Sequence, residues 1–200
     1  MAQPAATAHH NVATAPGLPP AGPVELPAES DTLYPVWLLL ESVCDPEIPV
    51  VSLREMGILR ALRPVGRTLE VVITPTYSGC PAMAQMADDI LQTLSDAGQP
   101  ATVSTVLAPP WSTTWMTASA HRKLREYGIA PPRHTASVCA SRADTRTIRL
   151  VRTAASDLTI ECPHCQSSDT VAISQFGSTA CKALYRCLSC REPFDYFKPY

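Results

Sequence analysis

Two Cys-x-x-Cys pairs near the C-terminus constrain the fold more than any other feature of this chain. The first pair is Cys162 and Cys165, the second is Cys187 and Cys190, and 21 residues separate the inner cysteines. Each pair lies on a tight turn that points both thiolates the same way, so four sulfurs can surround one tetrahedral metal ion at about 2.3 Å each. The interval is one residue longer than the usual zinc-ribbon range, which costs little because inserted loop residues are tolerated. Iron in a rubredoxin-like site uses the same ligands, so the choice of metal stays open.

The segment that carries these pairs, residues 158–200, is too short to fill a hydrophobic core of its own. Metal binding would therefore supply its folding free energy. All four ligand positions come from the protein, which leaves none for a substrate or an activated water, so we expect structural zinc. His164 inside the first pair is more typical of a solvated turn, and Cys181 ranks below the four as an alternative ligand.

Composition limits the remaining possibilities. The chain has 200 residues, 46% of them apolar, and a formal net charge of −2. This length fits one ordinary domain or two small ones, and the charge gives no global attraction to nucleic acid or anionic lipid. Residues 1–30 are rich in Ala and Pro, contain no Lys or Arg and have no long apolar run. We expect a disordered arm there, no membrane span, and a soluble cytoplasmic protein.

Residues 31–127 alternate between helical and strand-like hydrophobic patterns. This order predicts an α+β fold: a small α/β sandwich with helices on a three- or four-stranded sheet, followed by a zinc ribbon with four cysteine ligands. We expect helices from residue 31 to the break at Asp45 and at 81–97 and 112–127, and strands at 58–63, 68–74 and 102–107.

Residues 128–157 lack sustained periodicity and are predicted to form a linker between the two domains. Basic residues are concentrated between residues 122 and 152, where only Glu126 and Asp144 are acidic. The cluster is either a solvated connector or a docking strip for an acidic partner or an anionic ligand. We name it the basic strip: Arg122, Lys123, Arg125, Arg133, Arg142, Arg146, Arg149 and Arg152.

A lone cysteine, Cys80, lies in the stretch TPTYSGCP just before the predicted second helix. Pro81 fits the first helical position, which makes Cys80 the expected N-cap. Helix amides would then lower the pKa of the thiol and make it a nucleophile or soft-metal ligand, although a buried unreactive cysteine is the alternative. Asp45 and Glu47, in the stiff turn CDPEIP, are either solvated acids or carboxylates near the Cys80 loop.

Three sequence stretches resemble a known family: DPEIPVVSLREMGI at 45–58, TPTYSGCP at 74–81 and GSTACKALYRC at 177–187. The first two are similar to a small iron–sulfur assembly domain. With the cysteine pairs, residues 32–200 resemble the D subunits of the phenylacetyl-CoA epoxidase (phenylacetate-CoA oxygenase) system of aerobic phenylacetate catabolism.

The resemblance implies a non-catalytic accessory factor that helps mature the multicomponent monooxygenase. Its partners would be the other epoxidase components, either the reductase with its iron–sulfur centre or the di-iron oxygenase subunit. It also implies a transient iron or cluster ligand at Cys80, a supporting acidic turn at Asp45 and Glu47, and structural zinc on the four paired cysteines.

Two other function classes compete with this one. A nucleic-acid-binding zinc-ribbon protein would use the basic strip, but residues 158–200 carry four basic and four acidic side chains, which argues against a phosphate-binding surface. A thiol enzyme would use Cys80 as nucleophile and His121 or His134 as base, yet neither histidine lies in a recognisable catalytic motif.

Overall fold

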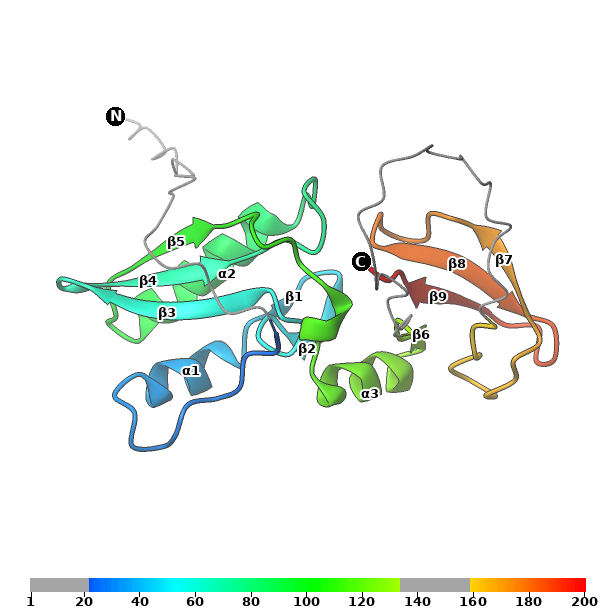
Figure 1. Ribbon diagram of the computed structural model, residues 1–200, viewed down its shortest axis with the longest axis horizontal. Helices are drawn as coiled ribbons and strands as arrows, with labels where there is room; N and C mark the ends of the chain where they lie inside the picture. The colour runs from blue at the N-terminus through cyan, green and yellow to red at the C-terminus, as the bar shows by residue number, and fades with distance from the viewer. Residues whose placement is uncertain (1–21, 134–158) are drawn as a thin grey trace, which may run out of the picture. The chain divides into compact units, whose positions relative to one another are not determined.

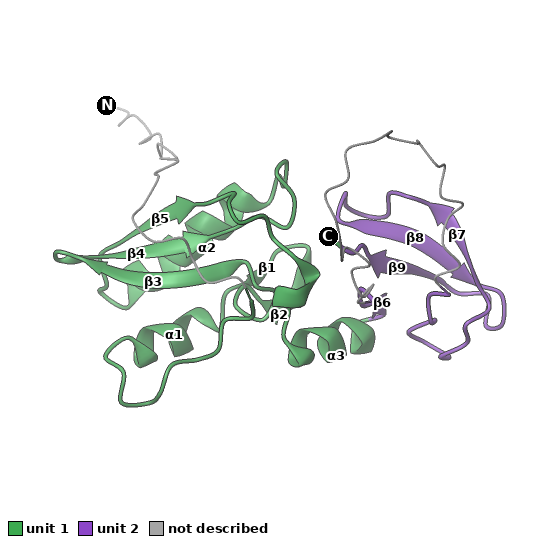
Figure 2. Ribbon diagram, in the orientation of Figure 1, with its two compact units in different colours: residues 1–127, 200 green, residues 128–199 purple. Residues whose placement is uncertain are grey.

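The computed structural model describes residues 22–133 and 159–200 of the chain (Figure 1). They fall into two compact units (Figure 2). The α/β unit runs to Tyr127 and includes Tyr200, and the ribbon unit comprises residues 128–199. Residues 1–21 of the predicted arm and 134–157 of the predicted linker lie outside the described residues.

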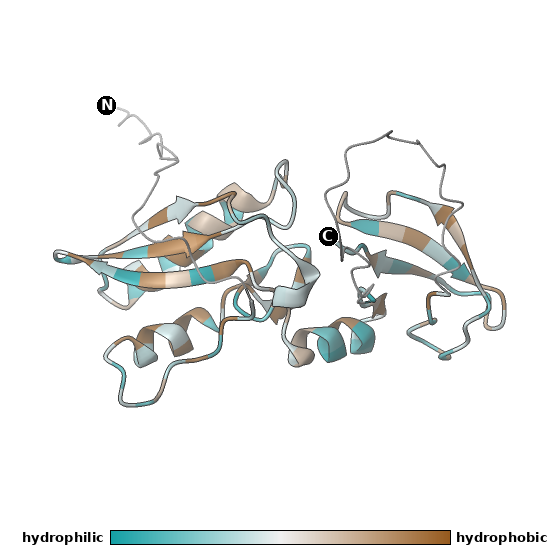
Figure 3. Cartoon of the chain, viewed as in Figure 1, coloured by the Kyte–Doolittle hydropathy of each residue, from teal (hydrophilic) through white to brown (hydrophobic). Residues whose placement is uncertain are grey.

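The α/β unit is built on a three-stranded sheet with the order β3-β4-β5. β3 (Leu59–Val65) and β4 (Thr68–Ile73) form an antiparallel hairpin, and β5 (Ala101–Thr105) pairs with β4 in parallel. The central strand is the most apolar (Figure 3), and Val71, Val72 and Ile73 at its end are fully buried. The sheet and its helices confirm the predicted α+β class.

The described part of this unit contains three α-helices: α1 (Tyr34–Leu40), α2 (Met83–Asp96) and α3 (Ala118–Glu126). α2 lies behind the sheet in Figure 1 and contacts β5 and α1. Helical spacing predicts one apolar face with Met83, Met86, Ile90 and Leu94; the last three are buried, and Met83 in the first turn is only partly buried.

The single helix predicted at 112–127 is wrong, because the chain breaks there. A short 3-10 turn, η1 (Thr113–Trp115), is followed by extended backbone at Met116. Thr117 then caps α3 by accepting a hydrogen bond from the amide of Ala120 at 3.1 Å. Hydrophobic periodicity alone allows a threonine in the middle of a helix. Here the Thr117 hydroxyl binds a backbone amide instead, and so marks the start of a new helix.

The last part of the predicted arm belongs to the fold. Val24 is buried, and the guanidinium of Arg54 donates to its carbonyl oxygen at 3.1 Å. Arg60, itself buried, donates to the carbonyl oxygen of Gly22 at 2.9 Å. The arm is poor in apolar residues, so its composition does not reveal that two distant arginines bind its backbone.

Gly57 allows the turn before β3 to pack against Trp115. Its φ is +71°, and a Cβ there would lie 2.7 Å from the Trp115 Cβ and 2.8 Å from its carbonyl oxygen. We therefore expect Gly57→Ala to lower the free energy of unfolding by about 2–4 kcal/mol, measured by urea denaturation. Gly66→Ala is the matched control, with φ +61° and open space, and should cost only about 1 kcal/mol. Equal losses would contradict the packing argument.

The ribbon unit has a four-stranded sheet with the order β6-β9-β8-β7. Its strands are β6 (Ile129–Ala130), β7 (Thr170–Ser174), β8 (Lys182–Cys187) and β9 (Pro193–Phe197). β6 runs parallel to β9, and the other pairs are antiparallel. Residues 128–133 therefore belong to this unit rather than to a linker. Two strand residues are too few to produce a readable hydrophobic pattern.

Candidate metal sites

The four paired cysteines meet at one point of the ribbon unit. All four Sγ atoms lie within 4.8 Å of one another. The Sγ atoms of Cys162 and Cys190 are 3.7 Å apart, and those of Cys165 and Cys187 are 3.5 Å apart. A tetrahedron with Zn–S bonds of about 2.3 Å has S–S edges of about 3.8 Å. The donor set and its spacing therefore fit zinc.

The backbone around each pair explains why the sulfurs converge. The residue after each second cysteine has a positive φ, 64° at Gln166 and 66° at Arg191, which reverses the chain. The amide of Cys190 donates to the Cys187 Sγ at 3.5 Å and lowers the pKa of that thiol. Four thiolates at this spacing repel one another, so a bound dication is what would keep all of them ionised.

The two alternative ligands lie outside this cluster. Cys181 is buried elsewhere in the ribbon unit, with its Sγ 3.0 Å from the hydroxyl of Thr179. The ring of His164 lies near Gly128: a Cβ added to Gly128 would be 3.2 Å from the Cε1 atom of that ring. Neither belongs to the four-cysteine group.

Cys80 lies in the loop between the central strand β4 and helix α2. In open sheets that contain parallel strands, this carboxyl end is where ligands commonly bind. The helix begins later than predicted, with Ala82 at the N-cap position, so the prediction that Cys80 is the N-cap is wrong. Its sulfur nevertheless accepts hydrogen bonds from the amides of Ala82 and Met83, which pull the thiol pKa down.

The net direction of the Cys80 pKa is opposite to our prediction. Burial raises the pKa of the thiol and outweighs the amides of Ala82 and Met83, and the carboxylates of Asp45 and Glu47 raise it further. A protonated thiol is a poor nucleophile, which argues against the thiol-enzyme alternative. A cation bound among these groups would reverse the effect, because it favours the thiolate and both carboxylates together.

The acidic turn carries the two carboxylates whose charge raises the pKa of the Cys80 thiol. It connects β1 (Cys44–Asp45) to β2 (Ile48–Ser52). Asp45 is buried, and its Oδ1 accepts a hydrogen bond from the amide of Glu47 at 2.8 Å. The charges of these two carboxylates therefore act on a thiol that lies more than 30 residues away in the sequence.

Both sites lie in segments of the chain that match known protein families. A family model described as "Iron-sulfur cluster assembly protein" matches residues 35–107, and one described as "PaaD zinc beta ribbon domain" matches residues 147–198. The chain is 42% identical over 167 residues to an Escherichia coli (strain K12) protein named as the putative D subunit of 1,2-phenylacetyl-CoA epoxidase. The match covers 83% of this chain and 92% of that protein. This chain belongs to the family of epoxidase D subunits.

Two solved structures are also similar to part of the chain. A domain of unknown function from Bacillus anthracis is 28% identical, with a TM-score of 0.42, and the match covers 45% of this chain and 88% of that one. A conserved hypothetical protein from Thermotoga maritima is 19% identical, with a TM-score of 0.40, and the match covers 48% of this chain and 97% of that one.

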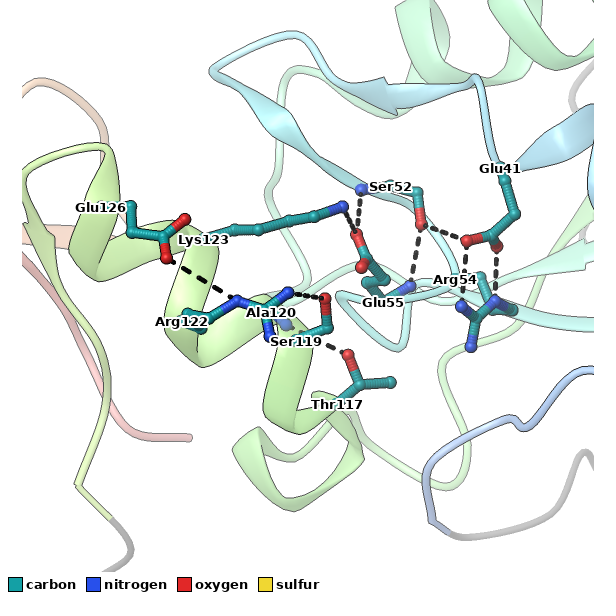
Figure 4. Close-up of polar contacts among 10 residues, drawn as sticks. All are labelled: Glu41, Ser52, Arg54, Glu55, Thr117, Ser119, Ala120, Arg122, Lys123 and Glu126. Atoms are coloured by element: carbon teal, nitrogen blue, oxygen red, sulfur yellow. Dashed lines mark hydrogen bonds and ion pairs between the residues drawn. The ribbon is translucent and has the colours of Figure 1, made fainter.

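In this member of the D-subunit family, a buried polar network fixes the end of the acidic hairpin (Figure 4). The amide of Ser52 donates to Glu55 Oε2 at 3.1 Å, and the amide of Glu55 donates to Ser52 Oγ at 3.2 Å. Lys123 of α3 reaches the same carboxylate at 2.7 Å. Sequence reasoning missed this network, although Ser-x-x-Glu is a capping-box signature. The network ties β2 to α3 and so positions the hairpin that carries Asp45.

The ionised form of Glu55 stabilises the fold. Burial raises the pKa of this carboxyl, but hydrogen bonds from Lys123, Ser119 and the Ser52 amide lower it below its ordinary value. Since the folded pKa is depressed, the stabilisation is present above the unfolded pKa of about 4.3 and is lost as pH falls through the folded pKa.

We expect Glu55→Gln to lower the free energy of unfolding by about 1–3 kcal/mol at pH 7. The difference from the parent protein should shrink as the pH falls below about 4.3, in urea denaturation curves measured at each pH. Glu126→Gln is the control, because the Arg122–Glu126 pair is largely exposed. A constant difference for Glu55→Gln across the acid range would refute the role of its charge.

The basic strip is only partly described, because residues 134–158 are not. Three of its described members form ion pairs: Arg122 with Glu126, Lys123 with Glu55 and Arg133 with Glu161. These pairs reduce the free positive charge available to a nucleic acid. His121 lies on α3, and His134 lies outside the described residues. Among the helices described, none is long and apolar enough to cross a membrane.

The loop before Cys80 also lines a pocket of about 420 Å³ that the sequence did not reveal. Residues 74–78 form one wall, and Leu107, Pro110 and Trp111 are among the others. The buried hydroxyl of Thr74 has no hydrogen-bond partner among the described residues. Cys80 itself does not line this pocket.

Proposed function

We propose that this chain is a non-enzymatic maturation factor for the multicomponent phenylacetyl-CoA monooxygenase. In this role Cys80 holds iron or an iron–sulfur cluster for transfer, and the zinc ribbon is structural and docks on the component that receives the metal, the client. The observation that supports the proposal is the environment of the Cys80 thiol, which accepts hydrogen bonds from the amides of Ala82 and Met83 and is influenced by the charges of Asp45 and Glu47.

The chemistry of these groups supports transient holding rather than catalysis. A thiolate is a soft ligand and a carboxylate a hard one, a combination that suits iron(II). One cysteine is fewer than the four that hold a resident cluster, so release to a client would be easier. The raised pKa of the Cys80 thiol means that the metal must displace a proton, which limits its affinity at neutral pH.

The family supports the choice of client. The curated relative is named as a subunit of 1,2-phenylacetyl-CoA epoxidase, and one family model is described as an iron–sulfur cluster assembly protein. The partners would accordingly be the reductase or the di-iron oxygenase subunit of the same system. Cytoplasmic localisation stays a prediction.

Anaerobic titration with iron(II) tests the proposal directly. The zinc-loaded chain should bind about one further iron per molecule, and Cys80→Ser should lose at least tenfold in affinity, or about 1.4 kcal/mol. Cys44→Ser is the matched control, because Cys44 is the other half-exposed free thiol of the α/β unit. Iron binding that Cys80→Ser leaves unchanged would remove Cys80 from the mechanism.

A further inference from the structure

The ribbon sheet of the described residues ends in an edge strand, β7. β7 is the outer strand in the order β6-β9-β8-β7, with no described strand beyond it. Edge strands expose unpaired N–H and C=O groups, and proteins usually protect them with charged residues or proline. β7 has the sequence TVAIS and contains neither. Among the residues that the structure describes, no strand pairs with its outer edge, which can therefore pair with another extended chain.

Exposed apolar side chains follow this edge. Val171 is 46% exposed, Ile173 is 53% exposed, and Phe176 just beyond the strand is 66% exposed. Hydrophobic residues are visible along β7 in Figure 3. Three large apolar groups within six residues of a small unit form a patch of the kind that marks interaction sites. We call Val171, Ile173 and Phe176 the edge patch.

Two cations flank the edge patch. Arg186 on β8 lies directly opposite Val171 in the antiparallel register, so both side chains are on the same face of the sheet. Arg186 is exposed and takes part in none of the ion pairs found among the described residues. Lys198 has its Nζ 4.7 Å from the centre of the Phe176 ring. The edge therefore combines apolar contact with two cations and one exposed carboxylate, Asp169, at the residue before β7.

We propose that β7 is a docking edge for an extended segment of another protein, which adds to the ribbon sheet as a fifth strand. The complementary segment carries apolar residues at alternate positions and acidic residues at its ends. A second copy of this chain that pairs through β7 is the alternative occupant, and the experiment below distinguishes it. The inference rests on the proposed function in that it gives the ribbon's client a binding surface.

Fluorescence anisotropy with two labelled synthetic peptides tests this inference. Both peptides have a five-residue core of alternating valine and threonine, and the ends carry two glutamates in one and two lysines in the other. The full-length zinc-loaded chain should bind the acidic peptide at least tenfold more tightly. Val171→Lys should weaken that binding about tenfold, and Arg186→Glu should reverse the preference. Zinc content and circular dichroism verify that both variants are folded.

Each alternative outcome overturns the inference. Equal affinity for the two peptides would show that charge does not select the partner. Binding of neither peptide, or binding that Val171→Lys leaves unchanged, would show that β7 is not a docking edge. Concentration-dependent dimers in sedimentation that disappear in Val171→Lys would assign β7 to a second copy. Cys80→Ser should bind the acidic peptide normally and Val171→Lys should bind iron normally, so failure of the docking edge is distinct from failure of the iron-holding role.

Discussion

Replacing Cys187 with serine is expected to unfold the ribbon unit while leaving the α/β unit folded. Cys187 is fully buried and belongs to both the four-sulfur cluster and the small core around it. Structural zinc in small domains contributes about 10–16 kcal/mol of apparent binding free energy, most of which is folding free energy. The α/β unit has its own sheet and core, so it does not depend on this metal.

Elemental analysis and limited proteolysis measure this effect. The parent chain should contain about one zinc per molecule, and Cys187→Ser should contain almost none and be cut rapidly after residue 157. Cys181→Ser is the control, because Cys181 is a buried free cysteine outside the cluster and its loss should leave zinc bound. Folded parent protein that contains neither zinc nor iron would contradict the account of the ribbon.

The second large effect separates function from stability at two nearby positions, Cys80 in the loop before α2 and Met86 on the helix itself. Cys80→Ser should change the free energy of unfolding by less than about 1 kcal/mol, since a serine hydroxyl accepts the same amide hydrogen bonds. Met86→Asp should cost about 3–5 kcal/mol, because Met86 is only 1% exposed on the inward face of α2 and a carboxylate there has no partner. Thermal unfolding of both variants checks this difference. Equal destabilisation would show that Cys80 is a packing residue.

The features that could be predicted from sequence are those with short-range signatures. The spacing of Cys162, Cys165, Cys187 and Cys190 predicts their convergence, because a tight turn orients each pair. The helical spacing of the apolar residues on α2 and the continuous apolar end of β4 predict the sheet and the helix that covers it.

The features that could not be predicted depend on distant residues or on very short elements. β1 and β6 have two residues each, fewer than any periodic pattern needs. The burial of Val24 depends on Arg54, 30 residues away. The direction of the Cys80 pKa depends on burial and on how near Asp45 and Glu47 come to it, and no local motif contains that information.

Transfer of iron or cluster to an apo client tests the central claim most directly. The reductase and the di-iron oxygenase subunit of the epoxidase system, each stripped of metal, are incubated with iron-loaded chain, and recovery of the client's metal centre is followed spectroscopically. The account predicts that the parent protein and Cys44→Ser restore one of the two clients, and that Cys80→Ser, although folded and zinc-loaded, does not. Equal restoration by Cys80→Ser would contradict it.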